Sequence, residues 1–296
     1  MLILKLVYNN NLDFVSEIQE LRAILIKKDI KIGIVESVEL DNYIVKILCD
    51  DSTYNEKIKE IINLYISNLL YTVVIQQYKE KEMFDFLTEN YFFLKQDEIM
   101  EVEENITRVL LGEESIKCEN LIYCMNKMNN IIEKIKNCIE ENSEININGF
   151  IMFRMKELRE DIEGVIDKVI EGYMVEKEYK EFVKLLKYFV DIQESKIDEV
   201  NIIIDELGNY FIRDKNKNDI FEEFMKELIE CRIDNDTKME DVIISGLITN
   251  APKKLIIHGE KNCLNKEFIE TIKNVFENKV AFCDDCSLCS VKQVKF

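Results

Sequence analysis

The sequence has very few of the residues that interrupt helices or form flexible linkers. Its 296 residues include one proline, eight glycines and no tryptophan. Because proline and clustered glycine mark turns and linkers, their scarcity predicts long helices and argues against linkers rich in these residues. The amino terminus also lacks a basic segment followed by a long apolar run and a small-residue cleavage site. We therefore expect no secretory signal and a cytoplasmic protein.

Positive charge is outnumbered by negative charge: 39 lysines and arginines stand against 58 aspartates and glutamates, which gives a formal net charge of -19. Such a charge repels phosphate backbones and anionic lipid surfaces, so we expect no nucleic-acid binding. The most apolar stretch, residues 61–75, contains Asn63 and Asn68. It is shorter than the roughly 20 residues that a membrane-spanning helix needs. We expect a buried helix there and no membrane insertion.

Motifs for nucleotide binding or nucleophilic catalysis are missing as well. The sequence contains neither GxGxxG nor GxxxxGK[ST], and no nucleophile-elbow pattern. Any catalyst that uses histidine would have to use His258, because it is the single histidine. These absences favour a binding protein over an enzyme.

Periodicity predicts a β-α-β-β unit over residues 1–52. Strand-like residues at 2–8 precede a helical apolar period, and two alternating runs at 32–40 and 43–47 follow it. A helical region is expected over residues 53–196, opened by a capping-box pattern at Thr53 and Glu56. Breaks in it are expected near Glu80, Gln96 and Gly112.

The remaining residues, 197–296, have the pattern of a small α/β unit. Two β-rich runs flank a turn at 206–209, which predicts a hairpin, and two helices should follow. Strand, helix and strand patterns over 253–283 then predict a βαβ crossover with parallel strands. The predicted fold class is helix-rich α+β.

Three segments are distinctive: "NINGFIMFRMKEL", "EYKEFVKLLKYFVDIQESKIDEVNIII" and the closing "PKKLIIH…FCDDCSLC". They resemble the YtxC-like family of sporulation proteins from spore-forming Firmicutes. The resemblance extends over most of the chain and is most specific between Asn146 and Ile204. It implies an association with sporulation, but it supplies no reaction and no catalytic residues.

Four of the nine cysteines cluster near the carboxyl terminus, at Cys263, Cys283, Cys286 and Cys289. Cytoplasmic cysteines are typically thiols or metal ligands rather than disulfides. In a βαβ crossover, His258 and Cys283 both fall at the carboxyl ends of parallel strands, on the edge where ligands usually bind.

These residues give a hypothesis for a metal site. Three cysteines with His258 or Cys263 would supply the four N/S ligands of structural zinc, and four cysteines could hold an iron–sulfur cluster, which we favour less. The CxxCxxC spacing is less specific than a paired CxxC motif, so a redox pair and free terminal thiols remain alternatives.

Three interpretations of function remain open at this point. We favour a sporulation-associated binding or regulatory protein with a protein partner, no assigned activity and a carboxyl-terminal metal site. The second is a thiol-redox or metal-dependent enzyme that uses Cys283 and Cys286. The third is a purely structural interaction protein.

Overall fold

The computed structural model describes residues 1–9, 15–28, 30–39, 42–52, 54–115, 118–222, 238–283, 286 and 288–289. These residues form two compact units, Met1–Met174 and Val175–Phe296. The domain boundary expected after residue 52 falls within the first unit, and the one expected after residue 196 falls within the second. Each unit has its own hydrophobic core.

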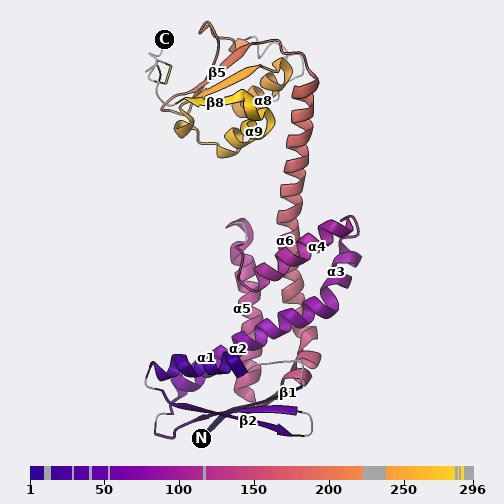
Figure 1. Cartoon of the computed structure of the whole chain (residues 1–296), viewed down its shortest axis with the longest axis vertical. Coiled ribbons are helices and arrows are strands. Elements are labelled where there is room, and N and C mark those ends of the chain that lie inside the picture. The colour runs from indigo at the N-terminus through magenta and orange to yellow at the C-terminus, as the bar shows by residue number, and fades with distance from the viewer. Residues whose placement is uncertain are drawn as a thin grey trace. The chain divides into compact units, whose positions relative to one another are not determined.

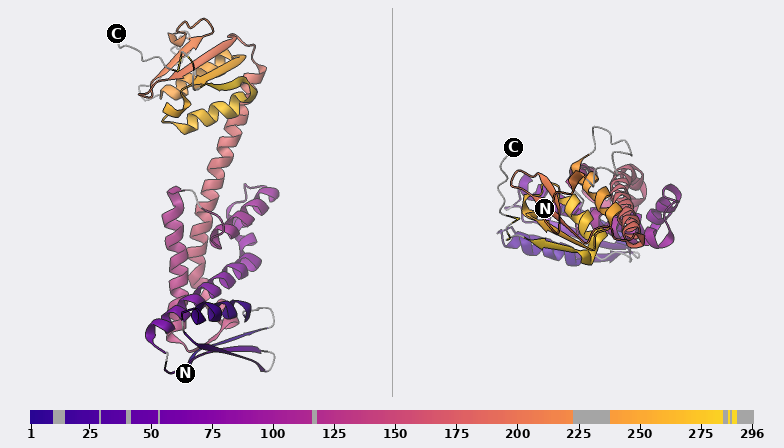
Figure 2. Two further views of the ribbon diagram at one scale, coloured as in Figure 1. Left: turned by 60° about the vertical axis from the view of Figure 1, so that its left-hand side comes forward. Right: turned by 90° about the horizontal axis from the view of Figure 1, so that it is seen from above.

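The first unit begins with the predicted β-α-β-β arrangement. Its elements are β1 (Leu2–Asn9), α1 (Val15–Ile26), β2 (Ile32–Glu39) and β3 (Asn42–Cys49). β4 (Glu144–Asn146) completes a sheet of order β2-β3-β1-β4, in which β4 runs parallel to β1. Strand alternation buries Leu4, Leu6 and Tyr8 on one face. Figure 2 shows α1 lying along one face of this sheet.

Helices make up the rest of the first unit. They are α2 (Glu56–Tyr78), a π-helical turn (Lys79–Met83), α3 (Phe84–Asn90), α4 (Gln96–Leu110), α5 (Cys118–Glu141) and α6 (Ile147–Ile192), whose last part belongs to the second unit. Breaks therefore lie near Gln96 and Gly112, as predicted. Near Glu80 the helix does not end but continues through the π-helical turn into α3. The first cap differs from the prediction: the Asn55 side chain accepts a hydrogen bond from the Ile58 amide, and Thr53 lies outside the described residues.

One helical stretch of the described chain, Glu56–Asn90, is long and apolar enough to cross a membrane. More than half of its apolar window, 56%, is buried inside the protein. The core helix of a soluble protein has the same length and composition, so the stretch is weak evidence for a membrane span.

The second unit contains a mixed sheet of order β6-β5-β7-β8. Its elements in chain order are β5 (Glu199–Ile204), β6 (Tyr210–Asp214), α8 (Met239–Asn250), β7 (Lys254–His258), α9 (Lys266–Phe276) and β8 (Val280–Cys283). The hairpin β5–β6 is antiparallel, and β7 is parallel to both β5 and β8, which confirms the predicted hairpin and βαβ crossover. The first helix expected after the hairpin lies mostly in the gap between residues 222 and 238, outside the described residues.

One face of this sheet contributes to the core of the second unit. Val200, Ile202, Leu255 and Ile257 share one face and belong to the core cluster that includes residues of α8 and α9. Figure 1 shows these two helices beside the sheet. The alternating positions place Asn201 and His258 on the opposite face.

Candidate metal centre

The candidate centre begins with two residues that end neighbouring parallel strands. His258 is the last residue of β7, Cys283 is the last residue of β8, and the two are register partners. Partners in parallel strands project from the same sheet face. The sheet therefore brings His258 and Cys283 together at the edge that the βαβ pattern predicted.

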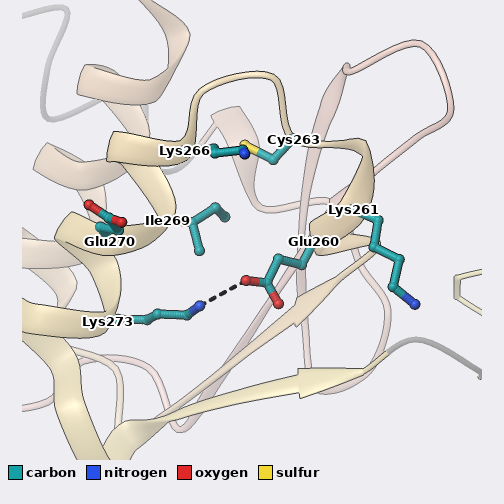
Figure 3. Close-up of a pocket in the computed structure, with 7 residues that line it drawn as sticks. All are labelled: Glu260, Lys261, Cys263, Lys266, Ile269, Glu270 and Lys273. Atoms are coloured by element: carbon teal, nitrogen blue, oxygen red, sulfur yellow. Dashed lines mark hydrogen bonds and ion pairs between the residues drawn. The ribbon is translucent and has the colours of Figure 1, made fainter. Parts of the chain in front are cut away.

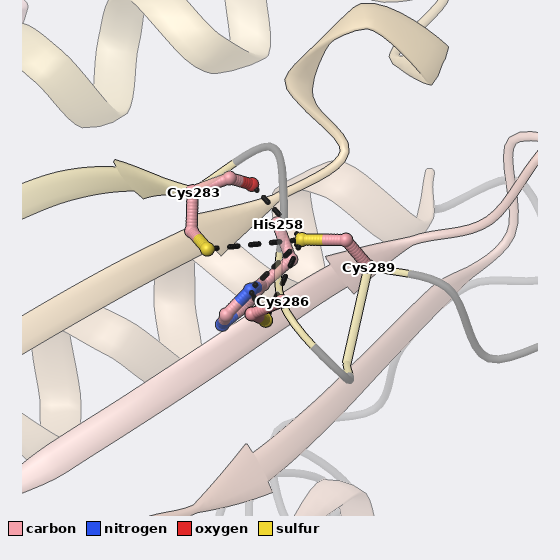
Figure 4. A group of neighbouring side chains, drawn as sticks. All are labelled: His258, Cys283, Cys286 and Cys289. Carbon is pink, nitrogen blue, oxygen red and sulfur yellow. Dashed lines mark hydrogen bonds between the residues drawn. The ribbon is translucent and has the colours of Figure 1, made fainter.

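The chain after β8 supplies two more thiols. The Cys286 and Cys289 sulfurs lie 3.3 and 3.4 Å from the Nδ1 atom of His258. The Cys289 sulfur is also 3.6 Å from the Cys286 sulfur and 3.8 Å from the Cys283 sulfur. One ligand atom from each of the four residues lies within 4.8 Å of all the others. Figure 4 shows the four side chains gathered at the ends of the strands.

These separations suit a tetrahedral metal ion. With Zn–S bonds of about 2.3 Å, tetrahedral geometry places two sulfur ligands about 3.8 Å apart, and a sulfur and a nitrogen ligand about 3.6 Å apart. The two sulfur–sulfur distances that involve Cys289, 3.6 and 3.8 Å, match this requirement. The sulfur–nitrogen distances of 3.3 and 3.4 Å are slightly shorter. A Cys₃His donor set is also a recognised structural zinc set.

Protonation preferences differ among the four side chains. Burial lowers the pKa of His258, which favours the neutral imidazole that binds metals. Burial raises the pKa of Cys289 to about 11. For Cys286, burial also acts to raise the pKa, but hydrogen bonds from the backbone of Leu288 and Cys289 and from the neighbouring thiols lower it overall. Metal binding would therefore have to displace the proton of Cys289, so the metal affinity of the group should increase as the pH rises.

Cys263, which the sequence offered as an alternative ligand, is not part of this group. Its thiol donates a hydrogen bond to the Asn265 carbonyl and lies 3.4 Å from the Tyr210 hydroxyl. The side chain lines a separate cavity of about 300 Å³ beside α9, shown in Figure 3. His258, not Cys263, therefore completes the set of four.

Sequence reasoning missed one residue at the site. Asn201 in β5 is 5% exposed, and its Oδ1 atom lies 3.0 Å from the Nε2 atom of His258. The available signal was a single polar residue inside the apolar run "VNIII". A buried polar side chain needs a hydrogen-bond partner. In the neighbouring strand β7, the imidazole of His258 can be that partner.

The family model for the YtxC-like family matches residues 64–281. The chain belongs to the YtxC-like family. It is also 22% identical over 222 residues to "Uncharacterized protein YtxC" of Bacillus subtilis (strain 168), covering 74% of this chain and 76% of that protein. No solved structure matches the chain. The family match includes His258 but ends before Cys283, so family membership gives no information about the three clustered thiols.

Proposed function

We propose that the second unit binds one structural zinc ion through His258, Cys283, Cys286 and Cys289. The proposal rests on the observation that these four nitrogen and sulfur donors lie within 4.8 Å of one another. Structural zinc sites use four protein ligands, whereas catalytic sites leave a coordination position open for water or substrate. Four protein donors thus support a closed, structural site in a binding protein rather than a catalytic centre.

Zinc fits this donor set better than an iron–sulfur cluster does. A cluster is typically held by four cysteine thiolates, and among the described residues the group contains three cysteines and one histidine. The bound ion would tie the segment after β8 to the end of β7. Its chemical contribution would be to cross-link these two parts of the second unit.

A thiol-redox role is the second candidate, and one specific observation favours it. The pKa of Cys286 is lowered, and its sulfur lies 3.6 Å from that of Cys289. A thiol with a lowered pKa beside a second thiol is the arrangement that thiol–disulfide exchange requires.

Metal analysis of protein purified without oxygen separates these possibilities. We expect about one zinc per chain and no visible absorption from iron–sulfur clusters. Cys286→Ser and Cys289→Ser should each lose most of the zinc. Cys263→Ser is the matched control, because this cysteine lies in the same unit but outside the group, and it should retain zinc. Metal-free wild-type protein that also fails to take up added zinc would contradict the proposal.

We further propose that the protein acts in the cytoplasm during sporulation, through a protein partner. The sporulation role rests on the association that the resemblance to the YtxC-like family implies. The net charge of -19 disfavours nucleic acid as the partner. Deletion of the gene in a spore-forming host should change spore yield, timing or spore properties while vegetative growth is little affected. Unchanged sporulation would contradict this role.

A further inference from the structure

We propose that Asn201 is a positioning residue that makes the Nδ1 atom of His258 the metal-binding nitrogen. The inference rests on the proposed zinc site and adds a residue that contacts no metal itself. Metal-binding histidines commonly donate their second ring N–H to a neighbouring acceptor, which fixes the tautomer and the ring orientation. Asn201 occupies that position here.

The surroundings of Asn201 determine how its amide group is oriented. Its Nδ2 atom lies 3.3 Å from the Glu199 carboxylate and 3.4 Å from the Asp214 carbonyl. Both of these groups accept hydrogen bonds, so the NH₂ group must face them. The amide oxygen is therefore the atom that faces His258.

This orientation selects one tautomer of the imidazole. An amide oxygen only accepts hydrogen bonds, so the Nε2 atom of His258, 3.0 Å away, must carry a proton and donate it. In the neutral ring, Nδ1 then has the free lone pair. Nδ1 is also the nitrogen that lies 3.3 and 3.4 Å from the Cys286 and Cys289 sulfurs.

Register and burial place this pair within the sheet. Asn201 pairs with Ile256 and Ile203 pairs with His258, so Asn201 and His258 are diagonal neighbours on one face of adjacent strands. They are the buried polar residues in the described strands of the second unit, at 5% and 3% exposure. Each satisfies the hydrogen-bonding need of the other in an apolar sheet.

The single histidine of the chain makes the inference directly measurable. Full-length protein with ¹⁵N-labelled histidine gives one imidazole in an NMR spectrum. In the zinc-loaded protein we expect a directly bonded proton on Nε2 and a metal-bound shift for Nδ1. Bound zinc with the proton on Nδ1 would overturn the inference and leave the zinc site intact. Failure to bind zinc would contradict the proposed function instead.

Substitutions test whether Asn201 causes this selection. Asn201→Leu keeps a similar size and removes the acceptor, so zinc affinity measured against a competing chelator should fall about 10–100-fold. Asn250→Leu is the control, because that amide bonds to Gly246 in α8. Wild-type affinity in Asn201→Leu would overturn the inference. If this variant does not fold, the labelled wild-type spectrum decides.

Discussion

One buried carboxylate in the first unit, that of Asp161, forms ion pairs with two lysines. The side chain of Asp161 is 7% exposed and accepts hydrogen bonds from Lys127 at 2.8 Å and Lys134 at 2.6 Å. Burial alone would raise the pKa of this carboxyl, but the two lysines lower it below its ordinary value. The ion pairs therefore stabilise the fold only while Asp161 is ionised.

Asp161→Asn should lower the free energy of unfolding by about 2 kcal/mol at neutral pH, because two charge-assisted hydrogen bonds are lost. The pKa of Asp161 is lowered on folding, so its contribution is fully present above the unfolded pKa of about 3.9 and is lost as the pH falls through the folded pKa. Urea unfolding followed by circular dichroism should thus show the gap between variant and wild type closing at acid pH.

The matched control for this prediction is Glu140→Gln, which removes an exposed pair with Lys136 in α5. Exposed i,i+4 pairs contribute about 0.3–0.5 kcal/mol, so this variant should differ little from wild type. Equal effects of the two substitutions, or an Asp161→Asn effect independent of pH, would contradict the account of Asp161.

Among the elements, the turn after β7 has a strict backbone requirement. Gly259 has a φ of 72°, and a Cβ atom there would lie 2.5 Å from the Ile204 carbonyl oxygen. Its amide also donates a hydrogen bond to the Cys283 carbonyl. The turn thus links the strand that carries His258 to the strand that carries Cys283.

Gly259→Ala should destabilise the second unit by about 1–3 kcal/mol, since it combines a left-handed backbone with a clash against backbone. Thermal unfolding of the full chain measures this loss. Gly208→Ala is the control, because its φ is 80° but an added Cβ would meet only side-chain atoms at 3.6 Å and 3.8 Å and a backbone oxygen at 3.9 Å. If Gly259→Ala lowers the stability no more than Gly208→Ala does, the contact with the Ile204 carbonyl oxygen adds no cost, which would contradict the prediction.

Sequence patterns predicted the elements well because apolar spacing reports which face of each element is buried. The β-α-β-β opening, the hairpin and the βαβ crossover all follow from such spacing, and the crossover brought His258 and Cys283 to one edge. Spacing could not place Cys263, because the chain turns at Gly259 and carries that thiol toward Tyr210. Asn201 was missed because its partner lies 57 residues away.

For the molecule as a whole, the family match covers one of the four candidate metal ligands, His258. The family match covers residues 64–281, so it includes both the helical part of the first unit and most of the second. Cys283, Cys286 and Cys289 lie beyond it. The family match therefore says nothing about the role of these three thiols. That role depends on whether the four donors bind one zinc ion with the geometry described above.

X-ray absorption at the zinc edge of the zinc-loaded full-length protein tests this geometry most directly. We expect one zinc with three sulfur ligands at about 2.3 Å and one nitrogen ligand at about 2.0–2.1 Å. The same ligand set should persist in Cys263→Ser, whose thiol lies outside the group. Four sulfur ligands, or a shell made mainly of light atoms, would contradict the Cys₃His centre.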